Sequence, residues 1–527
     1  MRIEAAVGRR HQIDRKAHGA PPITNTHKIK RTTTLVVSAV LLAAILCIAY
    51  FALPFRKAEP EKRSIAVLPF QDFTGTREDE IFSSGMTESI ITDIAKVPGM
   101  FVIARNSVFR YRGKDVDVRK VGAELGVNYV LEGSVQRSGT IVRVNAQLIN
   151  VATGFHLWAQ KFDREVKDLF SLQDDISSRV VEALKLTLPA GASDAGKRRP
   201  TENMDAYEYY LRGLYYQANE SHADIDTSIA LFENAIRLDP EFALAYSALG
   251  SSYQGILFNY GSDKGLEQKA YIAIEKALTL DPNLAEGYSV RGDLLWTNGH
   301  GFPHEQALRE QYRALSLNPN LVNAHQSIGT IFLHIGLLAK GLEELRTTLT
   351  LDPTNTFCAP RIARIYWYQQ QFDSALAQLE RIPAQYWKVE HAIVLHDMGQ
   401  DNRAWELLQS TQWDSVQTSS DLASAYAILY AARGDSQEAE RSIARSVSLG
   451  HDASHFHHAQ FNIACAYAIL RNNPQAVAWL QKTTENGLPC YPLFSNDPNL
   501  RGLKDDKSYI ALLETLRRQW EYFGSNF

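Results

Sequence analysis

The sequence has few cysteines and none of the common motifs of an enzyme active site. Four cysteines occur among 527 residues, too few for a disulfide framework. Cys465 and Cys490 could pair or remain buried thiols. No phosphate-binding loop of the form Gly-x-x-x-x-Gly-Lys-Ser/Thr occurs, and no Gly-x-Ser-x-Gly, His-Glu-x-x-His or Cys-x-x-Cys. We therefore predict a protein that is not an enzyme, with no catalytic residue, no cofactor and no bound metal.

A large net charge is also missing. The formal charge is -4 at pH 7, and basic residues are concentrated in the first 34 positions, so the rest of the chain is mildly acidic. A broad surface for nucleic acid is therefore not expected, and we predict no nucleic-acid partner. The 45% hydrophobic and 22% charged residues are typical of globular proteins and exclude disorder of the whole chain.

One long apolar run stands near the N-terminus. Residues 35–53 carry no charge, and Ser38 is their only polar side chain. At about 1.5 Å per residue such a helix spans roughly the 30 Å of a bilayer core. We predict a transmembrane helix at 35–53. A cleaved signal peptide and a lipoprotein site at Cys47 fit less well, because the run is long and bulky Leu46 precedes the cysteine.

Positive charge predicts the orientation of this helix. The preceding segment, 1–34, holds more lysine and arginine than the residues that follow the run. We expect 1–34 to be a basic cytoplasmic tail. The protein would then be a single-pass protein of the inner (cytoplasmic) membrane, attached through 35–53, with its body in the periplasm.

Residues 64–188 alternate between strand and helix patterns. A short apolar run at 65–70 is followed by apolar residues at helical spacing up to 94, and a second strand and helix end at Gly126. Strict alternation from 142 to 148 between two turns predicts a hairpin, and a last helical pattern closes the segment. We expect a small α/β domain.

This segment resembles the TolB amino-terminal-like domain of bacterial signalling proteins. The resemblance rests on four stretches: SIAVLPFQDFTG at 64–75, VLEGSVQRSG at 130–139, QLINVATGFHLWAQKFDRE at 147–165 and DLFSLQDDI at 168–176. It implies a mixed α/β module and brings no catalytic residues. Glu132, Arg137 and Arg143 could line a ligand site, although solvated faces and hairpin ion pairs explain them as well.

A linker and an array of repeats follow. Residues 189–204 have the small, polar, Pro- and Gly-broken composition of a linker. Four later segments end in Leu-Asp-Pro or Leu-Asn-Pro, and their prolines are spaced by 42, 37 and 34 residues: Pro240, Pro282, Pro319 and Pro353. Such a period is typical of a helical solenoid.

The fourth of these segments has the spacing of a tetratricopeptide repeat, with small residues where two helices would cross. The matching positions are Gly329, Phe332, Gly341, Leu345, Thr348 and Pro353. The resemblance implies about eight helix pairs in 205–487, with 488–527 as a capping segment. The predicted fold class is therefore α+β multidomain: one transmembrane helix, a small TolB-like α/β domain and an all-α tetratricopeptide superhelix.

Arrays of this kind bind extended peptides or other proteins along a concave surface made by the first helix of each pair. The repeat template places eight side chains on that groove: Gln254, Asp293, Trp296, Gln326, Thr330, His334, Arg364 and Trp367. We expect a protein or peptide partner, whose chemistry these mixed residues leave open.

Four histidines lie close together near the C-terminus, at His451, His455, His457 and His458. Helical spacing could bring some of them onto one side and allow metal binding. The surrounding residues have the pattern of the first helix of the last repeat, which favours a role in packing and at the surface.

Together these features predict a membrane-anchored, non-catalytic scaffold for protein interactions. In related architectures the same pair of domains follows a class III adenylate cyclase domain or a winged-helix DNA-binding domain. The alternative is therefore a sensory or regulatory component of cyclase or transcriptional signalling that acts through a separate output chain. An enzyme hidden in 64–188 is disfavoured, because no acid, base and nucleophile converge there.

Overall fold

The computed structural model describes most of the chain in seven segments. They are residues 63–184, 200–218, 221–260, 264–382, 387–409, 419–450 and 455–527. The chain divides into two units, Met1–Glu61 and Lys62–Phe527, and every described residue belongs to the second. Three predicted segments lie outside the described residues: the tail at 1–34, the transmembrane helix at 35–53 and most of the linker at 189–204.

Within the seven described segments, no helix has both the length and the apolar character needed to cross a bilayer. The longest of them, α24 (Lys507–Asn526), is amphipathic: it buries Tyr509, Leu516 and Phe523 and exposes charged side chains. The predicted fold class, with its transmembrane helix, and the predicted inner-membrane localisation are therefore wrong. The corrected fold class is a small mixed α/β region followed by a helical repeat superhelix.

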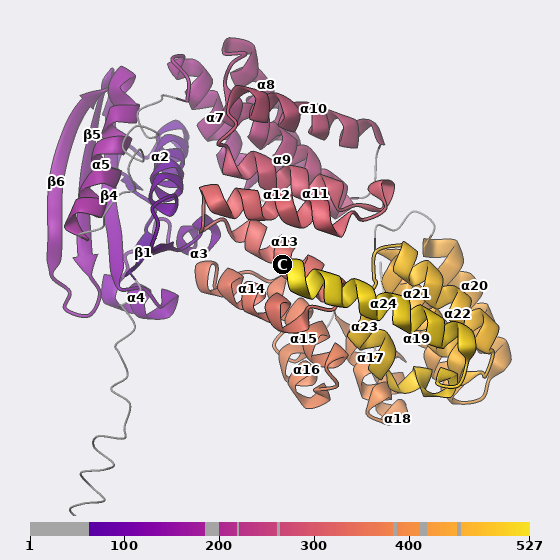
Figure 1. The fold of residues 1–527 in the computed structure, drawn as a ribbon. Helices are drawn as coiled ribbons and strands as arrows, with labels where there is room; N and C mark the ends of the chain where they lie inside the picture. Colours follow the sequence, from indigo (N-terminus) through magenta and orange to yellow (C-terminus); the bar gives the residue numbers. More distant parts are fainter. Residues whose placement is uncertain are drawn as a thin grey trace, which may run out of the picture. The chain divides into compact units, whose positions relative to one another are not determined.

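One mixed sheet is formed in the first described segment (Figure 1). Its strands are β1 (Arg63–Val67), β2 (Gln71–Asp72), β3 (Met100–Val102), β4 (Tyr129–Ser138), β5 (Ile141–Asn150) and β6 (His156–Glu165). The strand order is β3-β1-β4-β5-β6, and β2 pairs with β4. Strand β1 runs parallel to β3 and β4, whereas β4, β5 and β6 are antiparallel. In β5, Val142 to Leu148 alternate between buried and more accessible positions, which confirms the predicted hairpin.

Four α-helices accompany the sheet: α2 (Arg77–Ala95), α3 (Arg105–Phe109), α4 (Val118–Leu125) and α5 (Leu169–Ala183), which follows the 3-10 turn η1 (Val166–Asp168). Helix α2 begins at Thr76, whose hydroxyl accepts a hydrogen bond from the Asp79 N–H at 3.1 Å. Helix α4 ends at Gly126 in the left-handed conformation, φ 68°, as predicted for a glycine terminator. The sequence pattern did not predict the short elements α3 and β2.

Eight helix pairs follow among the described residues. They are α7 (Met204–Gln217) with α8 (His222–Leu238), α9 (Ala243–Tyr260) with α10 (Lys264–Leu280), α11 (Ala285–Leu295) with α12 (His304–Leu317), α13 (Val322–His334) with α14 (Leu338–Leu351), α15 (Cys358–Tyr368) with α16 (Phe372–Leu379), α17 (Lys388–Asp397) with α18 (Asp401–Gln409), α19 (Ser420–Ala432) with α20 (Ser436–Gly450), and α21 (Phe456–Ile469) with α22 (Asn473–Glu485). A 3-10 turn, η2 (Asn298–His300), lies between α11 and α12. Each helix packs on its partner, and successive pairs pack together. The predicted helical repeats are thereby confirmed.

Small residues allow the helices of a pair to cross closely. A Cβ added to Gly329 in α13 would lie 2.8 Å from the Leu345 side chain of α14. Ala277 in α10, at another small-residue position of the repeat, is completely buried. Because interiors are packed as densely as crystals, these positions leave no room for a larger side chain.

The Asp or Asn before each repeat-ending proline stabilises the turn after the second helix. In all four turns its side chain accepts a hydrogen bond from the backbone N–H two residues later, over 2.9 to 3.2 Å. The acceptors are Asp239, Asp281, Asn318 and Asp352. This Asx turn explains why the recurring sequence is Asp-Pro or Asn-Pro.

Two of these turns also bind the sheet region. The Asn320 side-chain amide donates to the backbone carbonyls of Ala95 and Met100, at 2.7 and 2.9 Å, and its oxygen accepts from the Val102 N–H. In the next turn Asp352 accepts a 2.6 Å hydrogen bond from Ser107. These buried hydrogen bonds join β3 and α3 to the ends of the third and fourth helix pairs.

The first helix pair continues the hydrophobic core of the sheet region. Tyr207 of α7 and Phe242 are buried in the same cluster as the strands and α2. Helix α7 approaches α2 so closely that a Cβ on Gly85 would lie 2.7 Å from Leu211. The sheet region and the start of the array therefore share one core.

The C-terminal segment packs back on the middle of the array. It comprises α23 (Tyr491–Asn496), the 3-10 helix η5 (Pro498–Leu503) and α24. The Trp520 indole N–H donates to the Gly336 carbonyl at 2.9 Å, and the Lys340 ammonium donates to the Gly524 carbonyl at 3.3 Å. Phe523 lies in one cluster with apolar residues of α12 and α13. This segment therefore contacts the fourth repeat as well as the last.

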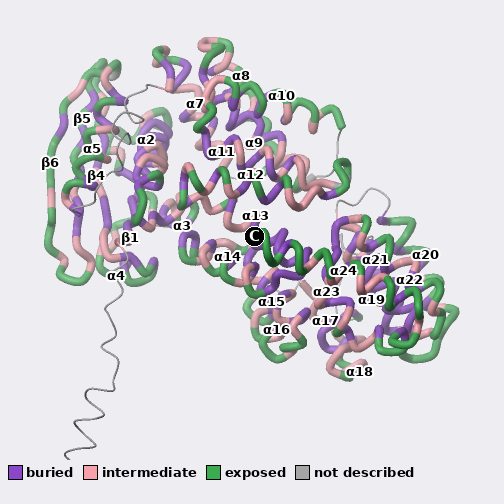
Figure 2. Tube along the Cα trace, viewed as in Figure 1, coloured by how far each residue is buried: buried purple, intermediate pink, exposed green. Residues whose placement is uncertain are grey.

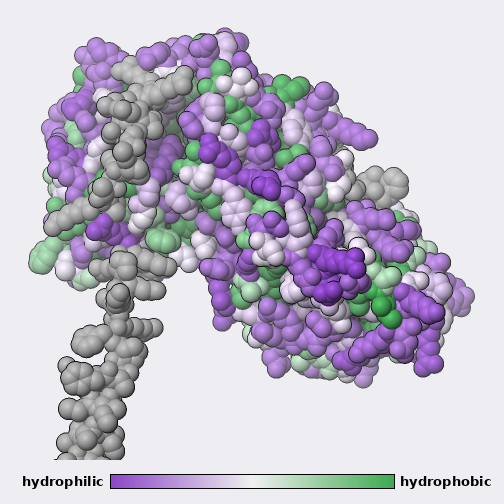
Figure 3. Space-filling model, viewed as in Figure 1, coloured by the Kyte–Doolittle hydropathy of each residue, from purple (hydrophilic) through white to green (hydrophobic). Residues whose placement is uncertain are grey.

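The described cysteines are buried free thiols, so Cys465 and Cys490 do not pair in this structure. Figure 2 shows that buried positions concentrate on the helices that face the interior of the array, such as α13 and α21. On the face shown in Figure 3, hydrophilic residues predominate and apolar ones form small separate patches.

Candidate functional site

The predicted groove residues lie on the first helices of four successive pairs. Gln254 is on α9, Asp293 on α11, and Trp296 directly follows α11. The remaining five are on α13 and α15: Gln326, Thr330, His334, Arg364 and Trp367. Thr330, His334 and Trp367 are buried, and the other five are partly exposed. The structure thus places seven of the eight on the first helices of their pairs and Trp296 directly after one, and three of the eight are buried within the chain.

Asp293 is held by polar side chains of two neighbouring helices. Its Oδ1 accepts hydrogen bonds from the Gln311 amide at 2.8 Å and from the Ser327 hydroxyl at 2.7 Å. Burial raises the pKa of this carboxyl to about 7, although both hydrogen bonds act in the opposite direction. A carboxyl that is half protonated near neutral pH is suited to link α11, α12 and α13 rather than to attract a basic peptide.

Trp296 belongs to an aromatic cluster. Its indole N–H donates to His304 Nδ1 at 2.8 Å, and its ring packs edge-on against Phe302 and His334 at centroid distances of 5.6 and 4.9 Å. Burial lowers the pKa of His304 to about 4, so this imidazole is neutral at physiological pH and can accept the indole hydrogen bond. Trp296 therefore supports the packing between repeats.

Arg364 is engaged by two side chains from later repeats. Its guanidinium donates to Glu390 of α17 and, at 2.7 Å, to His458 Nε2 of α21. The nearby Asp421 carboxyl has its pKa raised to about 6 by burial. The cavity beside these groups has a volume of only about 20 Å³, enough for one water molecule and too small for an organic ligand.

Two further predicted groove residues also have partners within the chain. The Trp367 indole N–H donates to Asp397 Oδ2 at 2.6 Å, and Asn499 of the C-terminal segment donates to Asp397 Oδ1 at 2.8 Å. The Gln326 side chain accepts from Asn355 at 2.9 Å. Later repeats and the C-terminal segment therefore occupy much of the inner surface that a template alone assigns to a partner.

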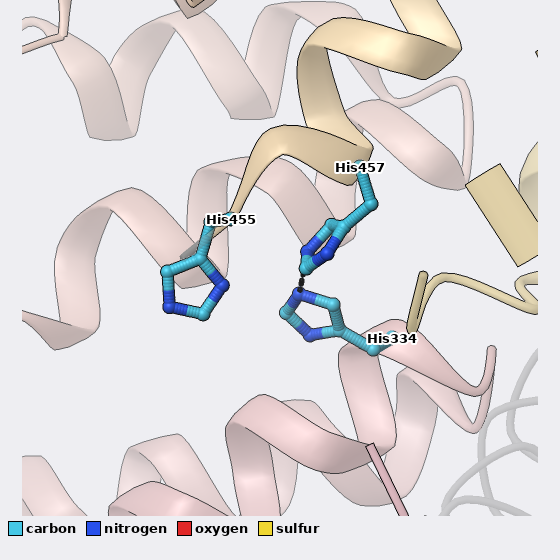
Figure 4. A group of neighbouring side chains, drawn as sticks. All are labelled: His334, His455 and His457. Carbon is cyan, nitrogen blue, oxygen red and sulfur yellow. Dashed lines mark hydrogen bonds between the residues drawn. The ribbon is translucent and has the colours of Figure 1, made fainter. Parts of the chain in front are cut away.

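The histidines near the C-terminus meet a histidine from a distant repeat. His334 at the end of α13 contacts His457 of α21, with 3.2 Å between their Nε2 atoms. His455 lies beside them at the start of α21, and Figure 4 shows these three side chains. His451 lies outside the described residues. The sequence signalled the local group, but only the tertiary structure brings His334 to it.

The polar residues of the hairpin form ordinary surface pairs. Arg143 of β5 forms an ion pair with Asp163 of β6 at 2.7 Å, and both side chains are about half exposed. Glu132 accepts a hydrogen bond from Gln147, and Arg137 lies 3.6 Å from Glu208. These contacts favour cross-strand and surface pairs over a ligand site.

Comparison with known proteins gives matches to parts of the chain. Residues 61–179 match the family model described as HilA/YgeH-like transcriptional regulator, second domain. The expected TolB amino-terminal-like domain is not confirmed by this match. The array resembles a tetratricopeptide repeat protein from Parabacteroides merdae ATCC 43184, with 14% identity and a TM-score of 0.36 over 52% of this chain and 99% of that one.

Two curated relatives are similar over limited lengths. The chain is 43% identical over 190 residues to "Putative adenylate cyclase 3" of Rhizobium meliloti (strain 1021), which covers 36% of this chain and 32% of that protein. It is 25% identical over 266 residues to Superkiller protein 3 of Schizosaccharomyces pombe, covering 46% of this chain and 18% of that protein. The chain thus spans a third or less of these relatives. Its architecture is a tetratricopeptide-like helical repeat fold, preceded by a region similar to the second domain of HilA/YgeH-like transcriptional regulators.

Proposed function

We propose that this protein is a non-catalytic regulatory module that binds a protein partner through its repeats and acts on a separate output chain. The output chain would be a nucleotide cyclase or a transcription factor. The match of 61–179 to a regulator domain and the similarity to a cyclase-named protein support this assignment. We also propose the domain limits 64–188, 189–204, 205–487 and 488–527 for the α/β domain, linker, array and cap.

The attachment of the array to the sheet region carries this proposal. Asn320 satisfies three backbone groups of the sheet region, and Asp352 binds Ser107 there. Because these residues stand in the turns between repeats, a partner that changes the curvature of the array would pull directly on β3 and α3. The regulator-like region would thereby sense occupancy of the array.

We propose that the partner contacts the accessible part of the inner surface. Gln254 of α9 is partly exposed, and Phe258, one turn later, is 49% exposed. The Phe258 ring lies 6.2 Å from that of Phe357 at the start of α15, so an aromatic pair borders this part of the groove. Aromatic side chains of this kind contribute strongly to the affinity of protein interfaces.

The test is affinity capture from the source cells followed by quantitative mass spectrometry. We expect the double variant Gln254→Ala, Phe258→Glu to capture at least about 10-fold less cyclase or DNA-binding protein than the wild type does. This corresponds to a loss of about 1.4 kcal/mol in binding free energy. Ile272→Glu is the matched control, because Ile272 is a 63% exposed apolar residue on α10 of the same repeat. Equal recovery by both variants would contradict the proposed surface, and cyclic AMP formation by the purified chain alone would contradict a non-catalytic role.

A further inference from the structure

Three histidines from two distant segments converge inside the array. His334 ends α13, His455 precedes the first residue of α21, and His457 lies in its first turn. Each of the three offers one ring nitrogen, and these nitrogens all lie within 4.8 Å of one another. In Figure 4 a dashed line joins the rings of His334 and His457, which are perpendicular to each other, and the His455 ring stands beside them.

The His334 ring has a fixed orientation. Its Nδ1 lies 2.7 Å from the Thr330 carbonyl, which can only accept, so Nδ1 carries the proton and Nε2 carries a lone pair. That lone pair is directed at His457 Nε2, 3.2 Å away. A backbone carbonyl that orients a histidine through its second nitrogen is a usual feature of metal sites.

The spacing of the two Nε2 atoms suits a shared metal ion. Zinc binds imidazole nitrogen at about 2.0–2.1 Å in tetrahedral geometry, which separates neighbouring nitrogens by about 3.3 Å. His334 and His457 already have this separation. A ring nitrogen of His455 lies within 4.8 Å of those of the other two, so it has to approach them by at most about 1.5 Å to reach the tetrahedral separation.

Without an ion, the cluster leaves polar atoms unsatisfied. Because His334 Nε2 is an acceptor, His457 must donate from Nε2, and its buried Nδ1 then has no hydrogen-bond partner. The Nδ1 of His455 is also buried without a partner. With an ion, both Nε2 lone pairs would bind it and the His457 proton would move to Nδ1; the Asn486 backbone, which raises the pKa of this ring as a hydrogen-bond acceptor, is the acceptor available to it. Ion binding therefore removes a cost that the packed cluster otherwise carries.

The charges and ligand types around the cluster select among ions. Arg361 and Arg364 lie close enough to His455 to act on it electrostatically. These arginines disfavour weakly bound cations but would stabilise an anionic fourth ligand. Three imidazoles and no carboxylate favour zinc-like transition metals over Mg²⁺ or Ca²⁺.

We propose that His334, His455 and His457 form a three-histidine site for a divalent transition metal, with Zn²⁺ as its expected occupant and a fourth position left for water or an anion. The ion would connect the fourth repeat to the last one, whose ligands are more than a hundred residues apart in sequence. The bound ion would therefore cross-link the two repeats and fix the curvature of the array. This inference does not depend on the proposed partner surface.

The test uses the full chain with any histidine tag removed and with metal stripped by a chelator. Zn²⁺ binding is measured by competition with a chromophoric chelator, and the Co²⁺-loaded protein is examined by visible absorption. We expect one Zn²⁺ per chain and the absorption of tetrahedral Co²⁺. His455→Ala and His457→Asn should each weaken Zn²⁺ binding at least about 10-fold.

His458→Ala is the matched control, because His458 lies next to His457 but binds Arg364 through Nε2. It should retain Zn²⁺ binding. If His457→Asn fails to fold, the proposal is tested by Zn²⁺ binding to His455→Ala and by the Co²⁺ spectrum of the wild-type chain. Less than one Zn²⁺ per chain, equal binding by wild type and His455→Ala, or an octahedral Co²⁺ spectrum would overturn the proposal.

Discussion

The sheet region at 63–184 and the repeat array differ in how far apart in sequence their decisive contacts lie. In the sheet region, β4 pairs with β5 and β5 with β6 through tight connections, and helix α4 ends at its own glycine. In the array, pairs of neighbouring helices are equally local, but the inner surface joins α13 to α21 and α15 to α17 and α21. Local patterns therefore describe the first region well and the inner surface of the second poorly.

The largest expected change in stability comes from replacing one core leucine in each region. Leu148 of β5 and Leu345 of α14 are both completely buried. We expect Leu148→Ala and Leu345→Ala each to lower the free energy of unfolding by about 2–5 kcal/mol. Hydrogen exchange should show loosening throughout the sheet for Leu148→Ala but mainly in adjacent repeats for Leu345→Ala. Equally global loosening in both variants would remove the distinction between the regions.

The repeat template and the tertiary contacts predict different stabilities for the variant Trp296→Ala. The groove template predicts that Trp296→Ala leaves the fold nearly intact, whereas its contacts with His304, Phe302 and His334 predict a loss of about 2 kcal/mol in stability, less than for a fully buried tryptophan. Chemical denaturation measures this loss. Phe155→Ala is the control, because that aromatic is 75% exposed and its loss should change stability by less than about 0.5 kcal/mol. An unchanged midpoint for Trp296→Ala would favour the template.

Asn320 tests whether the two regions act as one body. Asn320→Ala removes the partner of three backbone groups, and leaving buried backbone groups unsatisfied costs about 1–3 kcal/mol. We expect faster amide exchange at Val102, whose N–H loses its acceptor, and easier proteolysis near β3. Asn323→Ala, an exposed position on α13, should change neither. Unaltered exchange at Val102 would show that this contact does not couple the regions.

A further prediction concerns pH. Because the folded-state pKa of Asp293 is raised to about 7, the folded protein binds more protons than the unfolded chain between the ordinary pKa near 3.8 and about 7. The contribution of Asp293 to stability is therefore present at low pH and is lost as pH rises through 7. Asp293→Asn, which keeps the oxygen that accepts from Ser327 and Gln311, should gain in melting temperature relative to wild type between pH 5 and 8. A pH-independent difference would contradict the raised pKa.

The groove residues show what sequence patterns can predict about a site. The repeat template assigned Gln254, Asp293 and His334 to the first helices of successive pairs, and they lie on α9, α11 and α13, because the template follows from the 3.6-residue helical period and small residues at crossings. It did not predict that His334 meets His457, or that Arg364 meets His458, because a template describes one repeat and its neighbours. The curvature of the whole array decides which distant repeats approach each other.

The predicted membrane helix at 35–53 lies outside the described residues, and no helix among those residues is long and apolar enough to cross a bilayer. The four histidines near the C-terminus were visible in sequence but explained as packing. The unsatisfied Nδ1 atoms that favour a metal site exist only once side chains are placed.

The sequence by itself determined the order of the main strands and helices of 63–184, without α3 and β2, the array of helix pairs and the Asp-Pro or Asn-Pro ends of the repeats. These features depend on contacts within a few tens of residues, which periodicity and turn chemistry encode directly. Only the tertiary structure decided that Asn320 and Asp352 hold the sheet region, that α24 returns to the fourth repeat, and that three histidines converge. Such contacts depend on small rotations between successive helix pairs, which accumulate along the array. No local sequence pattern encodes the accumulated rotation.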